Sequence, residues 1–114
     1  MTAQPKPPSI PIACDLTAIP AAERDAHIAA TQELFASVQA LEELPDGYSF
    51  RFANAPGMFL AIARFVEYER RCCPFFTFTI QAEAGHGALW LRLTGNDEVK
   101  AFAHANFVLA TPNP

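Results

Sequence analysis

A proline at position 74 divides the most regular part of this sequence into a helix before it and a strand after it. From residue 57 to 72, apolar side chains recur at helical spacing, whereas from 76 to 82 they alternate with polar ones. Proline cannot continue a helix, and it disfavours helical backbone in the preceding residue. The sequence therefore predicts that a helix ends beside Cys72 and Cys73, with the two sulfurs free to converge on one point.

Similar patterns predict the other elements. They indicate strands at residues 10–16, 48–52 and 89–93, and helices at residues 20–43 and 97–107. The predicted order is β-α-β-α-β-β-α. Because each strand has one apolar face, we expect an α+β fold with a four-stranded, mostly antiparallel sheet and helices on one face.

The length of 114 residues and the 51% hydrophobic content are those of a single globular domain with a core of its own. We expect this domain at residues 10–108. Residues 1–9 are expected to form a disordered, proline-rich arm, and residues 109–114 a frayed tail.

Charge and hydropathy exclude several classes of function. The net charge is −4, and the longest basic cluster is Arg70-Arg71, so the positive field that nucleic-acid binding needs is lacking. The sequence contains no apolar run of eighteen residues, so we expect no membrane span. The first residues lack the apolar run of a signal peptide, and the expected location is the cytoplasm.

Three cysteines carry the main functional signal. An odd number in a cytoplasmic chain argues against a disulfide framework, and leaves inert core thiols, a soft-metal site or thiol redox chemistry. The predicted first strand places Cys14 on its apolar face. If that strand packs under the second helix, Cys14, Cys72 and Cys73 could offer three thiolates to Hg(II), As(III) or Cu(I). The spacing is not that of a structural zinc site.

A carboxylate, Glu69, falls in the middle of the apolar stripe of the second helix. Such a group must be paired, hydrogen-bonded or neutralised. A structural partner is expected in Arg24, in Arg70 or in backbone amides; the alternative is a general base or ligand beside the thiols. His27 lies in the stripe of the first helix, either as a satisfied core residue or as a further member of the site.

Two segments resemble a group of uncharacterised short bacterial proteins. These proteins share an E-R-x-C-C-P-F signature, present here from Glu69 to Phe75, and a later L-W-L-R-L-T-G segment, present here from Leu89 to Gly95. Shorter matches occur at residues 14–17, 23–24 and 44–48. The resemblance implies an association with mercury- or metal-responsive regulators. The chain departs from the group around residues 18–20, which affects the expected start of the first helix.

Three functional hypotheses follow. The first is a cytoplasmic accessory protein that binds a soft metal or metalloid through Cys14, Cys72 and Cys73, with Glu69, Arg24, Arg70 and His27 tuning the site. The second is a thiol-dependent enzyme or redox sensor that uses the paired cysteines. The third is a non-catalytic dimeric module with core cysteines. For any homodimer, we expect contact through the open sheet face, with Trp90 and Phe75.

Overall fold

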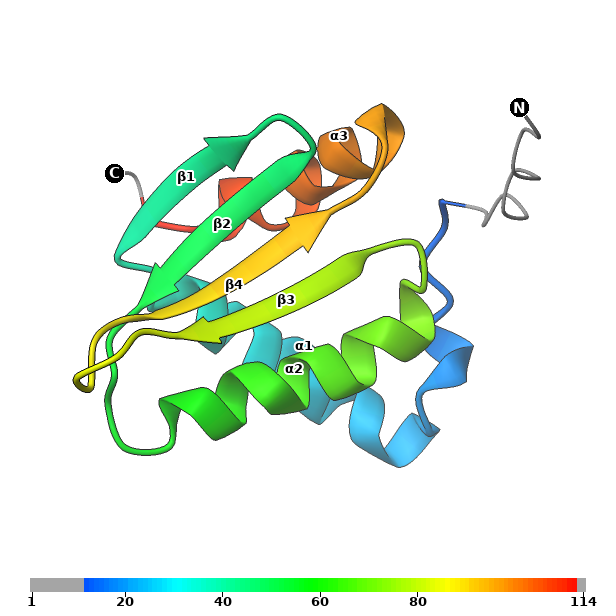
Figure 1. Ribbon diagram of the computed structural model, residues 1–114. Coiled ribbons are helices and arrows are strands. Elements are labelled where there is room, and N and C mark those ends of the chain that lie inside the picture. Colours follow the sequence, from blue (N-terminus) through cyan, green and yellow to red (C-terminus); the bar gives the residue numbers. More distant parts are fainter. Residues whose placement is uncertain (1–11, 113–114) are drawn as a thin grey trace, which may run out of the picture.

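The computed structural model describes residues 12–112, which form three α-helices and a four-stranded sheet. The helices are α1 (Ala21–Ala36), α2 (Met58–Cys72) and α3 (Asp97–Asn106), and the strands are β1 (Ala40–Leu44), β2 (Gly47–Phe52), β3 (Thr77–Ala82) and β4 (Leu89–Thr94). Short 3₁₀ turns occupy Leu16–Ala18 and Val108–Ala110. Figure 1 shows the arrangement.

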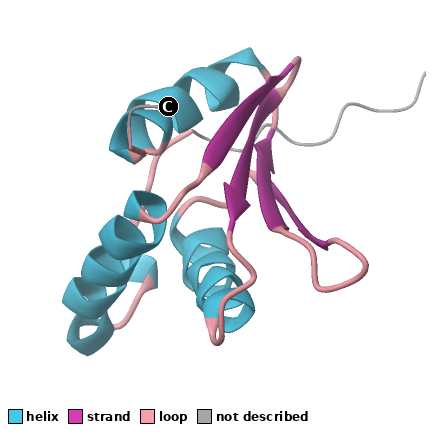
Figure 2. Cartoon of the chain, turned by 90° about the vertical axis from the view of Figure 1, so that its left-hand side faces the viewer, coloured by secondary structure: helices cyan, strands magenta, loops and turns pink. Residues whose placement is uncertain are grey.

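The four strands lie in the order β1-β2-β4-β3, and every neighbouring pair is antiparallel. The helices lie on one side of this sheet, as Figure 2 shows with the sheet nearly edge-on. The expected fold class, an α+β domain with helices on one face of a four-stranded antiparallel sheet, is therefore confirmed. Helix α2 spans the residues that its apolar periodicity predicts, and its apolar face packs toward the sheet.

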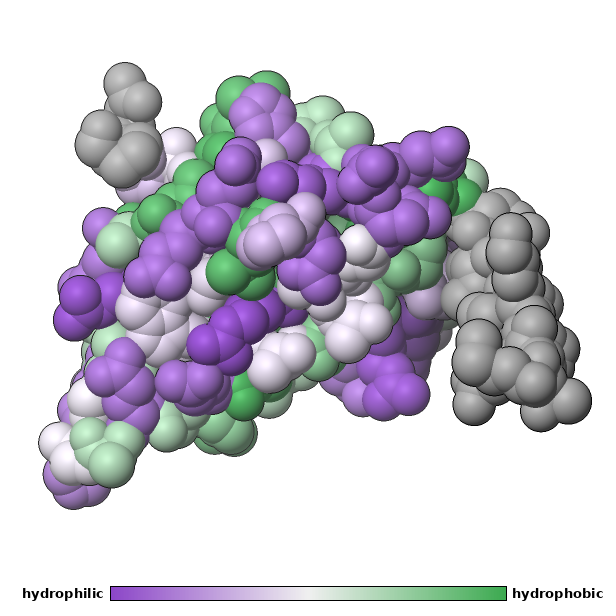
Figure 3. All heavy atoms as spheres, turned by 45° about the horizontal axis from the view of Figure 1, so that its top comes forward, coloured by the Kyte–Doolittle hydropathy of each residue, from purple (hydrophilic) through white to green (hydrophobic). Residues whose placement is uncertain are grey.

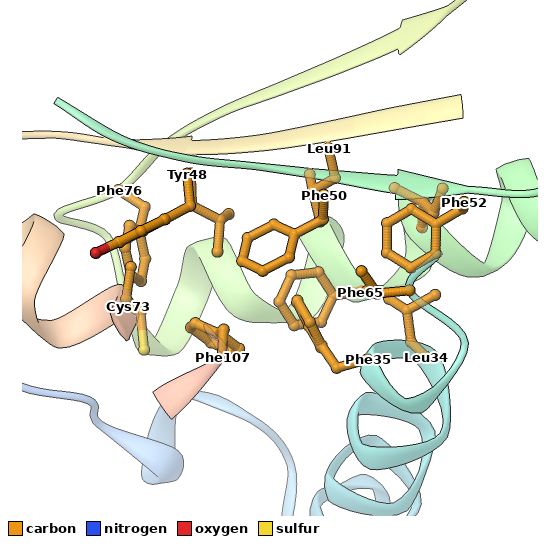
Figure 4. Packing of buried hydrophobic residues seen from close by; sticks show 14 of the residues in the cluster. Leu34, Phe35, Tyr48, Phe50, Phe52, Phe65, Cys73, Phe76, Leu91 and Phe107 are labelled. Atoms are coloured by element: carbon orange, nitrogen blue, oxygen red, sulfur yellow. The ribbon is translucent and has the colours of Figure 1, made fainter. Parts of the chain in front are cut away.

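A cluster of aromatic rings fills the space between sheet and helices (Figure 4). At its centre is Phe35 of α1, which is 0% exposed. Its ring centroid lies 5.1 Å from that of Phe50, 5.2 Å from that of Phe65 and 4.9 Å from that of Phe107. One side chain thus joins α1 to the sheet, to α2 and to the segment after α3, which fixes where the ends of these helices lie.

The strand expected at residues 10–16 is wrong where the structure describes it. Residues 12–15 are irregular, and a 3₁₀ turn begins at Leu16; residues 10 and 11 lie outside the described part. The Asp15 side chain accepts a hydrogen bond from the Thr17 backbone amide and so caps this turn. Local capping therefore outweighs a short alternation that has no neighbouring strand to pair with.

The helix expected at residues 20–43 ends early, at Ala36. The Ser37 amide bonds to the Leu34 carbonyl, which closes the last turn, and the Gln39 amide donates to the Arg51 carbonyl at 2.8 Å. From Ala40 onward the chain pairs with β2. The fourth strand thus comes from residues that the pattern assigned to a helix, because pairing with a distant strand satisfies their backbone groups.

The open face of the sheet is largely hydrophilic (Figure 3). The Arg92 side chain on β4 donates a hydrogen bond to the Gln81 side chain on the neighbouring β3, and the Trp90 indole donates one to the Glu83 carboxylate. Phe75 was expected on this face with Trp90. It is instead buried against Phe76 and Phe102, with ring centroids 4.8 and 5.0 Å away. Phe75 therefore belongs to the core, and a homodimer through this face stays a prediction that rests on Trp90.

Within residues 12–112, no helix has both the length and the apolar character needed to cross a membrane. The expected arm at residues 1–9 lies outside the described residues. Of the expected tail, Ala110 and Thr111 still make backbone hydrogen bonds, to the carbonyls of Phe107 and Val108.

Phe35→Ala should lower the free energy of unfolding by about 3–5 kcal/mol, because it leaves a cavity among four aromatic rings. Urea unfolding followed by circular dichroism measures this loss. Leu60→Ala is the control, since Leu60 is 70% exposed on α2 and its removal should change stability by less than about 0.5 kcal/mol. Equal losses in the two variants would contradict the central position of Phe35.

Candidate functional site

The site lies where α2 ends. Cys72 is the last residue of the helix, and Cys73 follows with φ −127° and ψ 67°, outside the helical region. The Cys73 amide still donates to the Glu69 carbonyl at 2.7 Å. The two sulfurs are 3.7 Å apart. The turn before Pro74 thus brings adjacent cysteines together, as the sequence predicts, although both remain buried.

Cys14 joins them through a covalent bond. Its sulfur forms a disulfide with Cys73, which closes a sequence separation of 59 residues. The odd number of cysteines argued against a disulfide framework, yet the structure contains this one bond. Next to this bond, the Asp15 amide donates to the Cys72 carbonyl at 2.8 Å. A segment far from α2 in sequence is thus tied to its end by a disulfide and by a hydrogen bond that does not depend on the disulfide.

Arg24 stabilises the same segment. Its Nε donates to the carbonyls of Leu16 and Ile19, each at 2.9 Å, and so holds the 3₁₀ turn against the start of α1. It does not pair with Glu69, and neither does Arg70, whose side chain is exposed on α2. Both arginines considered as partners of the buried carboxylate therefore lie elsewhere, because the first turn of α1 and the outer face of α2 point them away.

The partner of Glu69 is His27. Glu69 Oε2 lies 3.0 Å from His27 Nε2, and each residue is only 6% exposed. The imidazole is flanked by the rings of Phe65 and Tyr68, with centroids 6.2 and 5.2 Å away. This pair links the apolar faces of α1 and α2. Glu69 is thus a paired carboxylate next to the sulfurs. It has a structural partner, and it also lies where a ligand or general base beside the thiols would lie.

Cys72 is the free thiol of the site. Burial, and then the negative charge of Glu69, raise the pKa of its thiol to about 12. The sulfur lies 3.7 Å from the Glu69 carbonyl oxygen, to which it can donate a weak hydrogen bond. Cys72 is therefore a protonated thiol at neutral pH while the disulfide is formed, and it is a poor nucleophile in that state.

These residues form a compact donor set. One ligand atom from each of Cys14, Glu69, Cys72 and Cys73 lies within 4.8 Å of all the others. Three sulfurs and a carboxylate oxygen could hold a metal ion once the disulfide is reduced, since only free thiolates are good ligands. The three cysteines that the sequence indicated thus lie together. Cys14 belongs to an irregular segment and not to the expected strand.

A hollow of about 200 Å³ gives access to the donor set from outside. It is lined by Cys14, Glu69 and Cys72 together with the exposed polar side chains of Gln32 and Asn106. A second hollow, of about 730 Å³, is lined by residues of α1 and α2 and of the loop before α2. His27 lines both spaces. The sulfurs therefore lie close to the surface without being part of it, apart from the exposed Cys14.

Sequence reasoning missed the residues that build this access. Asp15 anchors the cysteine segment through its backbone, and its cap on Thr17 is the one local signal that could have been found. Gln32 and Asn106 come from two different helices, and no local pattern marks them as neighbours of the cysteines. Of the other histidines, His86 is exposed in the β3–β4 turn, and the ring of His104 lies 6.0 Å from that of Tyr48.

Comparisons with protein-family models, curated proteins and solved structures gave no match to this chain.

Reduction of the disulfide should lower the free energy of unfolding by about 2–4 kcal/mol, because the bond closes a long loop in the unfolded chain. Urea unfolding with and without dithiothreitol measures the change. Cys72→Ser keeps the disulfide and should show the same loss, whereas Cys14→Ser should show none. An unchanged midpoint for the wild type on reduction would contradict the prediction.

Alkylation of Cys72 by iodoacetamide should be very slow in the oxidised, folded protein. With the pKa at about 12, the thiolate fraction at pH 7.5 is on the order of 10⁻⁴ to 10⁻⁵, and it should rise about tenfold per pH unit. Mass spectrometry of samples taken between pH 7 and 10 measures the rate. The guanidinium-unfolded protein is the control. Complete labelling of the folded protein within minutes at pH 7 would disprove the raised pKa.

Proposed function

We propose that the reduced form of this chain is a cytoplasmic accessory protein that binds a soft metal ion or metalloid through Cys14, Cys72 and Cys73. The observation that carries the proposal is the convergence of three sulfurs and the Glu69 carboxylate within 4.8 Å. Three sulfurs around one ion, with metal–sulfur bonds of about 2.3 Å, lie roughly 4 Å apart. The Cys72 and Cys73 sulfurs already have this spacing, at 3.7 Å, and Cys14 and Cys73 can reach it once reduction breaks the bond between them.

Formation of the site from the oxidised state needs two electrons. Two molecules of a small thiol supply them, giving free Cys14 and Cys73 and one disulfide of the small thiol. The Asp15–Cys72 backbone hydrogen bond involves neither sulfur of the disulfide, and we expect it to keep Cys14 beside the end of α2 after reduction. The three thiols therefore stay close, and the ion displaces their protons when it binds.

The chemistry of the donors favours soft ions. Thiolates dominate the set, and soft ligands select thiophilic ions such as Hg(II), As(III) and Cu(I). The carboxylate of Glu69 adds negative charge next to the sulfurs, which stabilises a bound cation, while its bond to His27 limits its movement. The hollow above Cys14 and Cys72 offers a path from solvent. The resemblance to proteins associated with metal-responsive regulators agrees with this assignment.

The reduced wild type should bind one equivalent of Hg(II) with an affinity that withstands millimolar glutathione. Each of Cys14→Ser, Cys72→Ser and Cys73→Ser should weaken binding at least tenfold, because each removes a thiolate ligand. Anaerobic titration with detection of the sulfur-to-mercury absorption band measures this, and a parallel titration with arsenite tests the metalloid.

Two control proteins accompany this titration. His86→Ala changes an exposed turn residue away from the sulfurs and should bind as the wild type does. The oxidised wild type should not bind, since two of its three sulfurs are in the disulfide. Uptake no tighter than that of glutathione alone would refute the proposed metal site.

A second candidate is thiol–disulfide exchange, as in a redox sensor. It is favoured by one observation: a disulfide lies beside a third cysteine, with Cys72 Sγ 3.7 Å from Cys73 Sγ. The two candidates use the same sulfurs in different oxidation states. Metal binding requires the reduced state and is excluded by the disulfide, so the redox state would decide whether the chain can take up an ion.

A further inference from the structure

The two sulfurs of the disulfide differ in their surroundings. Cys14 lies in an irregular, exposed segment and lines the 200 Å³ hollow. Cys73 is 0% exposed and belongs to the core cluster, near Phe76 and Phe107 (Figure 4). The bond therefore joins a surface sulfur to an interior one.

This asymmetry determines which sulfur an external thiol can attack. A thiolate attacks a disulfide along the extension of the S–S bond, on the side opposite the leaving sulfur. For Cys14 that approach starts on the side away from the buried Cys73. For Cys73 it would start inside the core, where no thiol can enter without unfolding the packed rings. Access thus favours attack at Cys14.

We propose that the Cys14–Cys73 disulfide exchanges with low-molecular-weight thiols at Cys14, which carries the mixed disulfide, while Cys73 is the leaving cysteine. This inference rests on the thiol-exchange candidate and is independent of metal binding. The three cysteines then have different roles, and Cys14 is the residue through which external reductants act on the site.

The exchange proceeds in two steps. The small thiol, as thiolate, forms a bond to Cys14 Sγ; the Cys14–Cys73 bond breaks, and its electron pair leaves with the Cys73 sulfur, which takes up a proton. A second thiolate then attacks the small-thiol sulfur of the mixed disulfide and releases the Cys14 thiolate. Two small thiols are oxidised to one disulfide, and the protein gains two thiols.

The hollow suits a small partner of this kind. Its 200 Å³ is below the roughly 300–1,000 Å³ of pockets that hold drug-sized ligands. It can take the cysteinyl part of a peptide-like thiol, and the amide side chains of Gln32 and Asn106 can hydrogen-bond to peptide groups beside it. The imidazole of His27 and the carboxylate of Glu69, which also line the hollow, are buried and paired with each other. The partner is therefore recognised by size and by amide hydrogen bonds.

Internal exchange does not replace this route. Cys72 is 3.7 Å from Cys73, but a disulfide between these neighbours needs a small ring with strained geometry. Cys72 is also 2% exposed, so external thiols reach it less readily than Cys14. It stays reduced through the exchange, ready to act as a ligand once Cys14 and Cys73 are free.

Glutathione is the probe for the first test. Oxidised, folded wild type and Cys72→Ser are mixed with glutathione at pH 7.5, quenched with acid at short times, denatured, alkylated and mapped by mass spectrometry. We expect glutathione on Cys14 and a free thiol at Cys73 in both proteins. An adduct on Cys73 or Cys72 would overturn the assignment to Cys14 but leave thiol exchange standing. A disulfide that survives hours in millimolar glutathione would overturn both. Neither result bears on the mercury titration.

If the mixed disulfide is too short-lived to trap, a second measurement tests the assignment to Cys14. Cys72→Ser/Cys73→Ser leaves Cys14 as the single cysteine, and Cys14→Ser/Cys72→Ser leaves Cys73. With oxidised glutathione, the first variant should form its adduct at least tenfold faster than the second while both are folded by circular dichroism. Equal rates in the folded variants would overturn the inference. After unfolding in guanidinium the two variants should react at equal rates, which is the control.

Discussion

The carboxylate of Glu69 lies inside the protein, and a buried charge is stable only with a partner. The fold supplies His27 from α1, 3.0 Å away, and the pair joins α1 to α2, two of the three helices on the covered side of the sheet. With this contact in place, the end of α2 is fixed next to the start of α1. The cysteine segment then lies over that junction, held by Arg24 and by the Asp15 amide. The arrangement of the sulfurs thus depends on how one acidic residue is accommodated.

The sulfurs have two mutually exclusive uses. As a disulfide, Cys14 and Cys73 stabilise the attachment of the N-terminal segment to α2; as thiols, they can join Cys72 in one ligand set. The buried Glu69 favours the neutral thiol of Cys72 in the absence of a cation, because its negative charge opposes a nearby thiolate. A bound cation would reverse that balance. In the proposed function, redox state and metal binding are therefore linked through the same few atoms.

Much of the fold follows from local pattern. Helix α2, strands β2, β3 and β4, and helix α3 were all predicted, because their periodicity is strong and their ends carry proline, glycine or a capping residue. The pattern failed between residues 37 and 44, where apolar spacing fits a helix almost as well as a strand. There the hydrogen bonds to β2 decide, and they involve residues far along the chain. The irregular path around Cys14 was missed for another reason, because the cap of Asp15 on Thr17 outweighs a short alternation that has no neighbouring strand.

By itself, the sequence determined that a helix ends at Cys72 and Cys73, that these sulfurs can converge before Pro74, and that Glu69 lies on a buried face. Backbone sterics and helical periodicity are local properties, so they can be read from neighbouring residues. Only the tertiary structure decided that His27 is the partner of Glu69 and that Cys14 binds Cys73. Both contacts join residues more than forty positions apart, and they depend on how helices pack against a sheet.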